Sequence, residues 1–279
     1  MKTVFAKIYP IIAIFIIIAI VASGCQGKSS KVTRTTDEES VAEETEISKD
    51  EVVKELSDYP LPTSFEVTRL LIEAGASYIL DLCNKADNVG KYISLKSKAL
   101  NLGIYGADLS YAATYNQTQE TMQYLETSSK LIDELQISTA FNQTLVDRVE
   151  SNLDNVDSLI NIISDSFYDS YKYLQENQQD KLSLLIISGS WIEALYITTQ
   201  ITTITEDNQK IVDIISDQKS SLARLIEMLD PVKEDQIIAD IYSGLSNIKS
   251  IYDKAEEPFS QADLDKVLNA IETLRKSII

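Results

Sequence analysis

"LSLLIISGSWIEALYITTQITTI", residues 182–204, is apolar on nearly every face of the helix that its composition predicts. A helix without a polar face must be surrounded, either by other helices or by lipid. Ser188, Glu193 and several threonines interrupt the stretch, which favours the core of a protein over a membrane span. We therefore expect a buried helix over about 180–205, at the centre of an all-α domain.

A weak internal repeat links this stretch to an earlier one. "SGSWIEALYITTQ" (188–200) aligns with "LGIYGADLSYAAT" (102–114). The alignment matches Gly189 with Gly103, Trp191 with Tyr105, and Leu195 with Leu109. Extended to the neighbouring helices, the alignment makes the first three expected helices (about 63–136) the counterparts of the next three (about 146–229). The pattern then corresponds to a duplicated three-helix unit followed by a C-terminal helical hairpin.

The paired glycines predict how the two repeated helices meet. A glycine inside a helix costs about 1 kcal/mol relative to alanine, and it is tolerated best where another backbone must come close. We therefore expect the two helices to cross near Gly103 and Gly189. Tyr105 and Trp191 should then pack around the crossing.

Apolar periodicity predicts a bundle of about eight mostly antiparallel helices. Glycine (8) and proline (5) are scarce, which favours long helices over short strands. Besides the helix at 180–205, the expected helices cover about 63–86, 92–115, 117–136, a stretch around 146–174, 207–229, 230 to the residue before Pro258, and Ser260 onward. Only a mild breaker, "NQTQ" (116–119), separates the second helix from the third, so one continuous helix is also open there.

Between residues 146 and 174, apolar side chains recur every seven residues. The recurring positions are Val146, Leu153, Ile160, Phe167 and Leu174, with Val149, Val156 and Ile163 between them. Such a seam predicts one helix of roughly 36 residues that packs almost antiparallel to its neighbour. We expect that neighbour within the same chain, although a seam this narrow also fits a dimer interface.

The first residues follow the pattern of a secretory leader. Lys2 and Lys7 flank an apolar run, "IIAIFIIIAIVA" (11–22), that is too short to span a bilayer. "ASGC" (22–25) comes next, and small residues that end in cysteine resemble the lipobox of bacterial lipoproteins. The resemblance implies cleavage before Cys25 and lipidation of Cys25, with Ala22 where leucine is commonest. The alternative is an ordinary cleaved leader with an incidental cysteine.

These patterns divide the chain into a lipoprotein leader (1–24), a lipidated cysteine with a flexible acidic tether (25–62), and a single helical domain (63–279). Residues 26–47 are polar and lack aromatic side chains, so they cannot bury enough apolar surface to fold. The net charge is −18 at pH 7, and cleavage of the leader would remove two lysines and make the chain still more negative. Such a surface repels nucleic acid and anionic headgroups. We therefore expect no nucleic-acid partner and a domain that stands off the membrane.

No motif in the sequence indicates catalysis. The chain has no histidine, so Cys83 lacks the usual base of a catalytic thiol. Nucleotide- and calcium-binding motifs are missing, and we expect no cofactor and no metal. The Asp108 and Glu193 carboxylates, near the predicted crossing, are the remaining candidates for acid–base chemistry. We expect each to face water or a tyrosine hydroxyl at the edge of the core, and a protein that is not an enzyme.

Tyrosine is abundant, with 14 residues in the chain. Tyr111 and Tyr115 are four residues apart on one helical face, and their apolar bodies and polar tips suit sugar or aromatic ligands. Alternatively, the tyrosines line the boundary between the core and water. The candidate site, for a ligand or for packing between helices, therefore comprises Gly103, Tyr105, Asp108, Tyr111, Tyr115, Gly189, Trp191 and Glu193.

Three segments together resemble a family of uncharacterised helical lipoproteins of Bacteroidetes. They are "SFEVTRLLIEAGASYILDLCNKADNVGKY" (64–92), "ALNLGIYGADLSYAATYNQTQETMQYLE" (99–126) and "SGSWIEALYITTQ" (188–200). The resemblance implies a place in the cell envelope and no established activity, so no catalytic residue is carried over. Surface-exported members often carry acidic residues after the lipidated cysteine. "QGKSSK" (26–31) stands there instead, which favours the periplasmic leaflet of the outer membrane.

The sequence thus predicts an envelope lipoprotein, held in the membrane by its N-terminal lipid, that binds or organises another envelope protein. An alternative is a periplasmic protein that binds a small molecule or a glycan in a tyrosine- and tryptophan-lined groove between helices. A third hypothesis is a carboxylate-dependent enzyme. A filled core with an exposed apolar patch would favour the first, a deep cavity at the tyrosines the second, and buried carboxylates at an open cleft the third. The oligomeric state does not follow from the sequence.

Overall fold

The computed structural model describes residues 64–141, 144–205, 208–256 and 258–279. The predicted leader, Cys25 and the tether lie outside these residues. The described residues belong to one compact unit of the chain. They form α-helices and short 3-10 helices without any strand, and eight of their α-helices have ten residues or more. The predicted all-α bundle is therefore confirmed.

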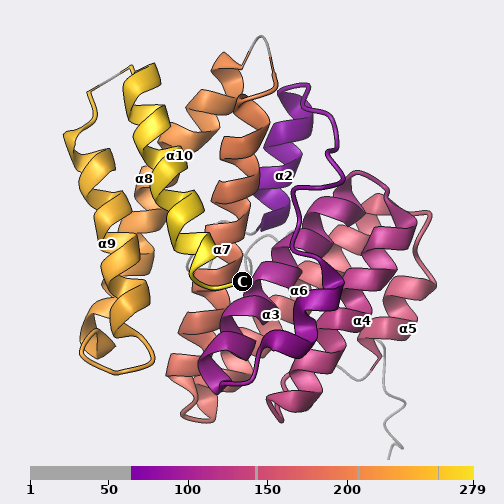
Figure 1. Cartoon of the computed structure of the whole chain (residues 1–279). Coiled ribbons are helices and arrows are strands. Elements are labelled where there is room, and N and C mark those ends of the chain that lie inside the picture. The colour runs from indigo at the N-terminus through magenta and orange to yellow at the C-terminus, as the bar shows by residue number, and fades with distance from the viewer. Residues whose placement is uncertain (1–63, 142–143, 206–207, 257) are drawn as a thin grey trace, which may run out of the picture. The chain divides into compact units, whose positions relative to one another are not determined.

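The helices follow one another along the chain, and the longest connection between them runs from α2 to η1 (Figure 1). The first segments are α2 (Ser64–Glu73), η1 (Ala86–Lys91), α3 (Leu95–Thr114) and α4 (Thr118–Glu134). The middle of the chain forms α5 (Leu145–Glu150), α6 (Val156–Glu176), α7 (Asp180–Thr202) and α8 (Gln209–Leu229). The C-terminal part forms η2 (Asp230–Val232), α9 (Ala239–Lys254) and α10 (Gln261–Lys276).

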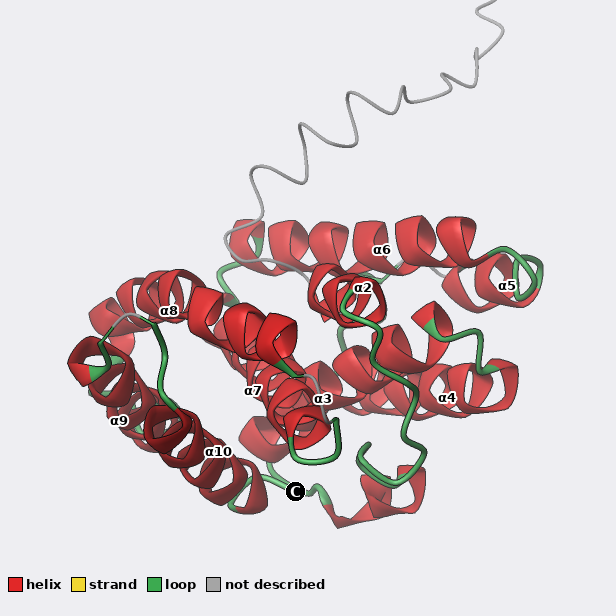
Figure 2. Cartoon of the chain, turned by 90° about the horizontal axis from the view of Figure 1, so that it is seen from above, coloured by secondary structure: helices red, strands yellow, loops and turns green. Residues whose placement is uncertain are grey.

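Two long helices, α3 and α7, form the centre of the bundle (Figure 2). Helix α4 packs beside α3 and α8 packs beside α7, while α2 and α6 each contact both central helices. The unit α2–α3–α4 therefore makes the same kinds of contact as the unit α6–α7–α8, in the order that the sequence repeat predicted. The C-terminal hairpin of α9 and α10 packs against α8 and α7.

The central position of α7 follows from its composition. It is the one described helix that is long and apolar enough to cross a membrane, but 83% of its apolar window is buried inside the bundle. Burial on all sides removes the need for a polar face. The predicted buried helix at 180–205 is confirmed.

The first predicted helix is shorter than expected. It ends at Glu73 instead of reaching residue 86, because Gly75 adopts φ +85°. The amide of Ala76 donates to the carbonyl of Leu71 and the amide of Gly75 to that of Ile72, each at 2.9 Å. These two bonds form a Schellman motif, which terminates a helix at a glycine. The chain from Ala76 onward is then free to run across the bundle to η1.

The predicted helix around 146–174 is wrong in its length. The chain turns at residues 151–155 between α5 and α6, and the Asn155 side chain starts α6 by accepting a hydrogen bond from the Ser158 amide at 3.1 Å. Asparagine and aspartate favour such caps over helix interiors. Four of the five seven-residue positions are therefore only partly buried (Val146, Leu153, Ile160 and Phe167), and the buried face of α6 carries Leu159, Ile162, Ile163, Ser166, Ser170 and Leu174.

Two further boundaries were left open or misplaced by the sequence. Helices α3 and α4 are separate, because Asn116 turns the chain with φ 56°. Asp230 and Pro231 begin the short 3-10 helix η2 instead of the predicted seventh helix, and α9 starts only at Ala239. The predicted start of the last helix is confirmed, since Ser260 accepts a hydrogen bond from the Asp263 amide at 3.2 Å.

Candidate functional site

The crossing of α3 and α7 brings two backbones into direct contact. A β-carbon added at Gly103 would lie 1.9 Å from the Ile186 carbonyl oxygen, and one added at Gly189 would lie 2.0 Å from the Leu100 carbonyl oxygen. Real β-carbons do not approach other atoms this closely, so only glycine fits at either position. The predicted crossing at these two glycines is confirmed.

The two contacts are reciprocal. Each glycine touches the carbonyl of the residue three positions before the other glycine, and Leu100 and Ile186 are themselves matched by the sequence repeat. A pair of helices related by a twofold axis makes contacts of this kind. The crossing therefore has local pseudo-twofold geometry, in the register that the repeat predicted.

The two aromatic residues of the repeat point to different partners. The Trp191 indole nitrogen donates to the Ser221 hydroxyl on α8 at 3.0 Å. The Tyr105 hydroxyl donates to the Lys85 carbonyl at 2.9 Å, and its ring stacks on Tyr124 of α4 with centroids 6.2 Å apart. Both side chains are buried, so they fill the space between helices and offer no open groove.

A second tyrosine cluster fixes the chain after α2. Tyr78 stacks on Tyr111 with centroids 4.8 Å apart, and Tyr115 packs edge-on against Tyr111 at 5.1 Å. The Tyr111 hydroxyl accepts from the Ile79 amide at 2.9 Å, and the Tyr115 hydroxyl donates to the Ala76 carbonyl at 2.8 Å. The expectation that the tyrosines line the boundary with water is wrong for Tyr111, as it is for Tyr105, because both are fully buried.

The expectation that Asp108 and Glu193 lie at the edge of the core is also wrong, since both are fully buried. Arg275 of α10 reaches into the bundle and pairs with both Glu193 oxygens, at 2.5 Å from Nε and 2.6 Å from Nη2. The guanidinium also lies 4.0 Å from the ring centroid of Tyr196, and Nη2 donates to the Leu82 carbonyl at 3.3 Å. Inside the core such a carboxylate requires a charged partner, which Arg275 supplies.

Asp108 occupies a different electrostatic position beside this pair. Burial raises the pKa of its carboxyl well above the usual value, and the nearby Glu193 carboxylate raises it further, whereas Arg275 opposes the shift. Its Oδ2 accepts a hydrogen bond from the backbone amide of Asn84 at 3.1 Å. Its Oδ1 is buried without a hydrogen-bond partner among the described residues. A proton on Oδ1 gives that oxygen a hydrogen to donate and removes the repulsion from Glu193. Asp108 is therefore best described as a neutral acid in the folded protein.

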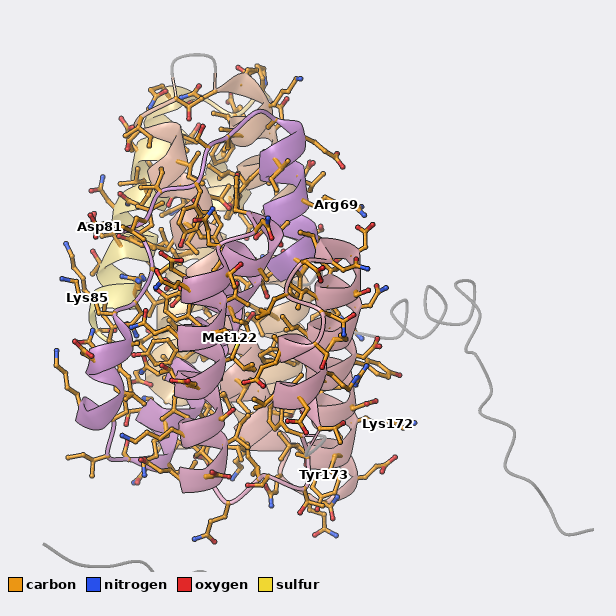
Figure 3. The ribbon with its side chains drawn as sticks, turned by 90° about the vertical axis from the view of Figure 1, so that its right-hand side faces the viewer. Arg69, Asp81, Lys85, Met122, Lys172 and Tyr173 are labelled. Carbon is orange, nitrogen blue, oxygen red and sulfur yellow. The ribbon has the colours of Figure 1, made fainter. Side chains whose placement is uncertain are left out.

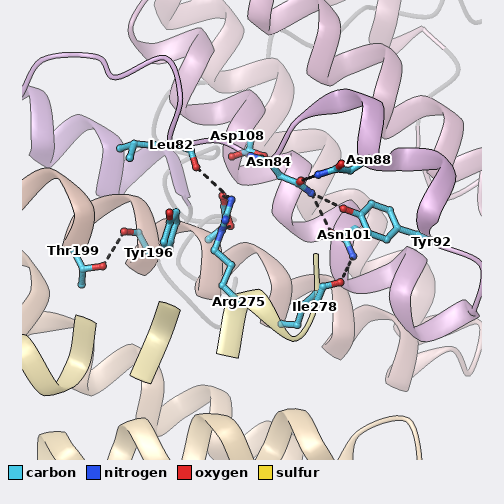
Figure 4. A network of polar contacts seen from close by, with 11 residues as sticks. Leu82, Asn84, Asn88, Tyr92, Asn101, Asp108, Tyr196, Thr199, Arg275 and Ile278 are labelled. Carbon is cyan, nitrogen blue, oxygen red and sulfur yellow. Dashed lines mark hydrogen bonds and ion pairs between the residues drawn. The ribbon is translucent and has the colours of Figure 1, made fainter. Parts of the chain in front are cut away.

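Uncharged side chains extend the network toward the C-terminus (Figure 4). The side-chain nitrogen of Asn84 donates to the Tyr92 hydroxyl at 2.8 Å and to the side-chain oxygen of Asn101 at 3.2 Å. Asn101 in turn donates to the Ile278 carbonyl at 3.1 Å. The network thus ties the chain before α3 and the end of α10 to the two central helices. The candidate site expected from the sequence did not include Asn84, Asn101 or Arg275.

A signal for Arg275 was present in the sequence. Ile271 lies four residues before it on the buried stripe of α10, so Arg275 falls on the same inward face. A charged residue on such a stripe requires a buried partner of opposite charge. For Asn84 and Asn101 we find no comparable pattern.

The arrangement connects the central helices to the C-terminal part of the chain through buried polar contacts. Asp108, Glu193 and Arg275 offer almost no surface to solvent, and within the described residues no group of three or more cysteine or acidic side chains is placed to hold a metal. Burial also raises the pKa of the Cys83 thiol well above its usual value, and Asp108 and Glu193 add to the shift. The thiolate form that a nucleophile needs is therefore disfavoured.

Comparison with known proteins gives no identification. No protein-family model matches the chain, and neither the curated proteins nor the solved structures contain a match.

Proposed function

We propose that the chain is a lipid-anchored helical protein of the bacterial cell envelope that binds or organises another envelope protein without catalysing a reaction. The "ASGC" at 22–25 supports the anchor, because it combines a small-residue run with the cysteine that a lipobox requires. The resemblance to helical lipoproteins of Bacteroidetes supports the same place in the envelope. The periplasmic leaflet of the outer membrane remains the location we favour.

The single observation that carries the interaction role is the filled crossing of α3 and α7. The side chains that best suited a ligand are buried and already contact other parts of the chain; they are Tyr105, Asp108 and Glu193. Large apolar side chains are instead exposed on the surface, among them Leu80 and Ile204. The interaction role therefore rests on the filled interior, and the exposed apolar side chains supply positions at which a partner can be sought.

The alternative of a ligand groove lined by tyrosine and tryptophan is less well supported. It requires Tyr105 and Trp191 to be reachable from solvent, and both are buried against neighbouring helices. The hypothesis of a carboxylate-dependent enzyme meets a similar obstacle, since the two buried carboxylates have no exposed surface.

Metabolic labelling with an alkyne fatty acid tests the anchor. Cys25→Ala should abolish labelling of the chain, because the thiol is the proposed acceptor of diacylglycerol. Cys83→Ala is the matched control and should be labelled like the wild type, since that thiol is buried in the bundle. Unchanged labelling of Cys25→Ala would contradict the proposal.

Photo-crosslinking in cells tests the interaction role. A crosslinking amino acid at Leu80 or Ile204 should recover the same envelope protein from either position, or from a cluster of positions around one of them. The control position is Lys172, whose side chain points into solvent away from the bundle (Figure 3). If all three positions give the same background of proteins, the interaction role is wrong.

A further inference from the structure

One surface segment departs from the acidic character of the chain. Residues 85–98, "KADNVGKYISLKSK", contain four lysines and one aspartate in a protein of net charge −18. We call this segment the basic turn. It comprises η1, the short connection at 92–94 and the first residues of α3.

The basic turn displays two large apolar side chains. Tyr92 and Ser94 have extended backbones, with ψ 101° and ψ 153°, so side chains alternate between the two sides of the chain. Tyr92 points inward and is buried, whereas Ile93 is 85% exposed, the highest exposure among the large apolar side chains described. Leu95, two positions on, is 53% exposed. The alternation places Ile93 and Leu95 on the outer side together.

Hydrogen bonds of the residues on both sides of Ile93 fix the backbone there. The Tyr92 hydroxyl accepts from Asn84 at 2.8 Å, which fixes one end of the connection to the buried network. The Ser94 hydroxyl accepts from the Ser97 amide at 3.0 Å and caps α3 at the other end. Ile93 therefore projects from a fixed backbone, and its exposure does not come from a frayed end.

Four lysines flank the two apolar side chains in the sequence. Lys85 and Lys91 form no ion pair with any described residue, and Lys85 extends into solvent at the edge of the bundle (Figure 3). Lys91 donates instead to the uncharged Asn88 side chain at 2.7 Å. The two other lysines of the basic turn are paired with carboxylates, Lys96 with Asp240 and Lys98 with Glu134. Asp87 is the one acidic residue within the segment.

A projecting apolar pair with unpaired lysines has the chemistry of a membrane-docking element. Apolar side chains enter the boundary between headgroups and acyl chains, while lysines remain at the phosphates. Each lysine near an anionic leaflet adds to the attraction, and the effect fades within a Debye length of about 10 Å. The acidic remainder of the domain is repelled at the same range, so the attraction must come from lysine-rich surface such as this segment.

We propose that the basic turn docks the domain on an anionic phospholipid surface by inserting Ile93 and Leu95 between the headgroups, with Lys85 and Lys91 against the phosphates. This proposal rests on the proposed lipid anchor, which keeps the domain near a membrane and makes even a weak contact effective. It modifies the sequence-based expectation that the domain stands off the membrane, because docking brings one face of an otherwise repelled domain to the surface.

Tryptophan fluorescence in proteoliposomes tests the docking. The anchored chain is reconstituted into vesicles of phosphatidylcholine with and without phosphatidylglycerol, part of the phosphatidylcholine being brominated as a quencher. Ile93→Trp should shift its emission to the blue and be quenched in the anionic vesicles. Ile204→Trp is the matched control, because Ile204 is 63% exposed but is not flanked by lysines, and it should stay unquenched. The native Trp191 is buried and supplies a constant background.

Charge reversal separates the contribution of the lysines to docking from that of the apolar side chains. Lys85→Glu with Lys91→Glu, added to Ile93→Trp, should lower the quenching in anionic vesicles at least twofold and leave the small signal in neutral vesicles unchanged. Equal quenching of Ile93→Trp and Ile204→Trp would overturn the docking proposal. Flotation of the chain with the vesicles reports the anchor separately. A floating chain without quenching at Ile93 therefore refutes docking alone, and quenching at Ile93 in a Cys25→Ala chain mixed with vesicles would support docking without the anchor.

Discussion

At the scale of single residues, Arg275 connects the C-terminal helix to the core. Its pair with Glu193 is buried, and its removal would leave a carboxylate without a partner in the interior. Burial alone would lower the pKa of the guanidinium, but the Glu193 carboxylate and its hydrogen bonds raise it instead, so the charge persists in the core. A buried pair of this kind is costly to break even where its formation contributes little.

Arg275→Met should therefore destabilise the fold by about 3–5 kcal/mol, because Glu193 loses its counter-charge. Arg69→Met is the matched control, since Arg69 pairs with Glu73 on the surface of α2 at 3.6 Å and such pairs contribute about 0–1 kcal/mol. Urea unfolding followed by circular dichroism measures both. Similar losses in the two variants would contradict the structural role of the buried pair.

Asp108 makes the stability depend on pH. The pKa of the Asp108 carboxyl is higher in the folded protein than in the unfolded chain, where the pKa of an aspartate is about 4. Between these two pKa values the folded state binds more protons, so stability should fall as the pH rises above about 4. Asp108→Asn should flatten this fall, because the asparagine accepts from Asn84 and donates toward Glu193 without titrating. Urea midpoints between pH 4 and 8 test it, and parallel curves for both proteins would contradict the neutral-acid assignment.

Gly103 tests the backbone contact between α3 and α7. Gly103→Ala places a methyl group where the Ile186 carbonyl lies, so the helices must separate despite the better helix propensity of alanine. Overpacking of this kind costs about 1–3 kcal/mol, which corresponds to several degrees in the melting temperature of a domain of this size. Gly244→Ala meets only the flexible Leu274 side chain and should cost less. An unchanged melting temperature for Gly103→Ala would rule out the close crossing.

At the scale of elements, helix ends decide where the predicted helices are right or wrong. Helices that match their predictions, such as α7 and α8, have long apolar faces and no internal break. The helices that differ contain a local stop that periodicity ignores, such as Gly75 after α2 or Asn155 before α6. Turn and cap residues compete with helix propagation over a few residues, and they prevail where packing does not oppose them.

Gly75→Ala tests the stop after α2. Gly75 has φ +85° and an open surrounding, so an added methyl group meets no atom but the backbone becomes strained. We expect a loss of about 1 kcal/mol in unfolding free energy. Gly90→Ala is the control, because Gly90 is equally open and does not have a positive φ. Equal stability of the two variants would show that φ at Gly75 does not matter.

At the scale of the whole molecule, the described helices are arranged around the α3–α7 pair, and the long helices α2, α4, α6, α8 and α10 each pack against at least one of the two. Hydrogen exchange should therefore be slowest for backbone amides in the middle of α3 and α7, because these open only when the whole bundle unfolds. Amides of the short α5 should exchange faster. Mass spectrometry of exchanged peptides measures this order, and equal rates in α5 and α7 would contradict a single core centred on the crossing.

The sequence by itself determined the all-α class, the central helix at 180–205 and the glycines at which it crosses its counterpart. These follow from local composition and spacing, because apolar periodicity and helix propensity are encoded in neighbouring residues. Only the tertiary structure decided which polar groups meet in the core. Arg275, Glu193 and Asn84 come from segments far apart in the chain, and their partners depend on how helices pack. That packing also buried Asp108 and raised its pKa, since the cost of a charge depends on surroundings that no local pattern specifies.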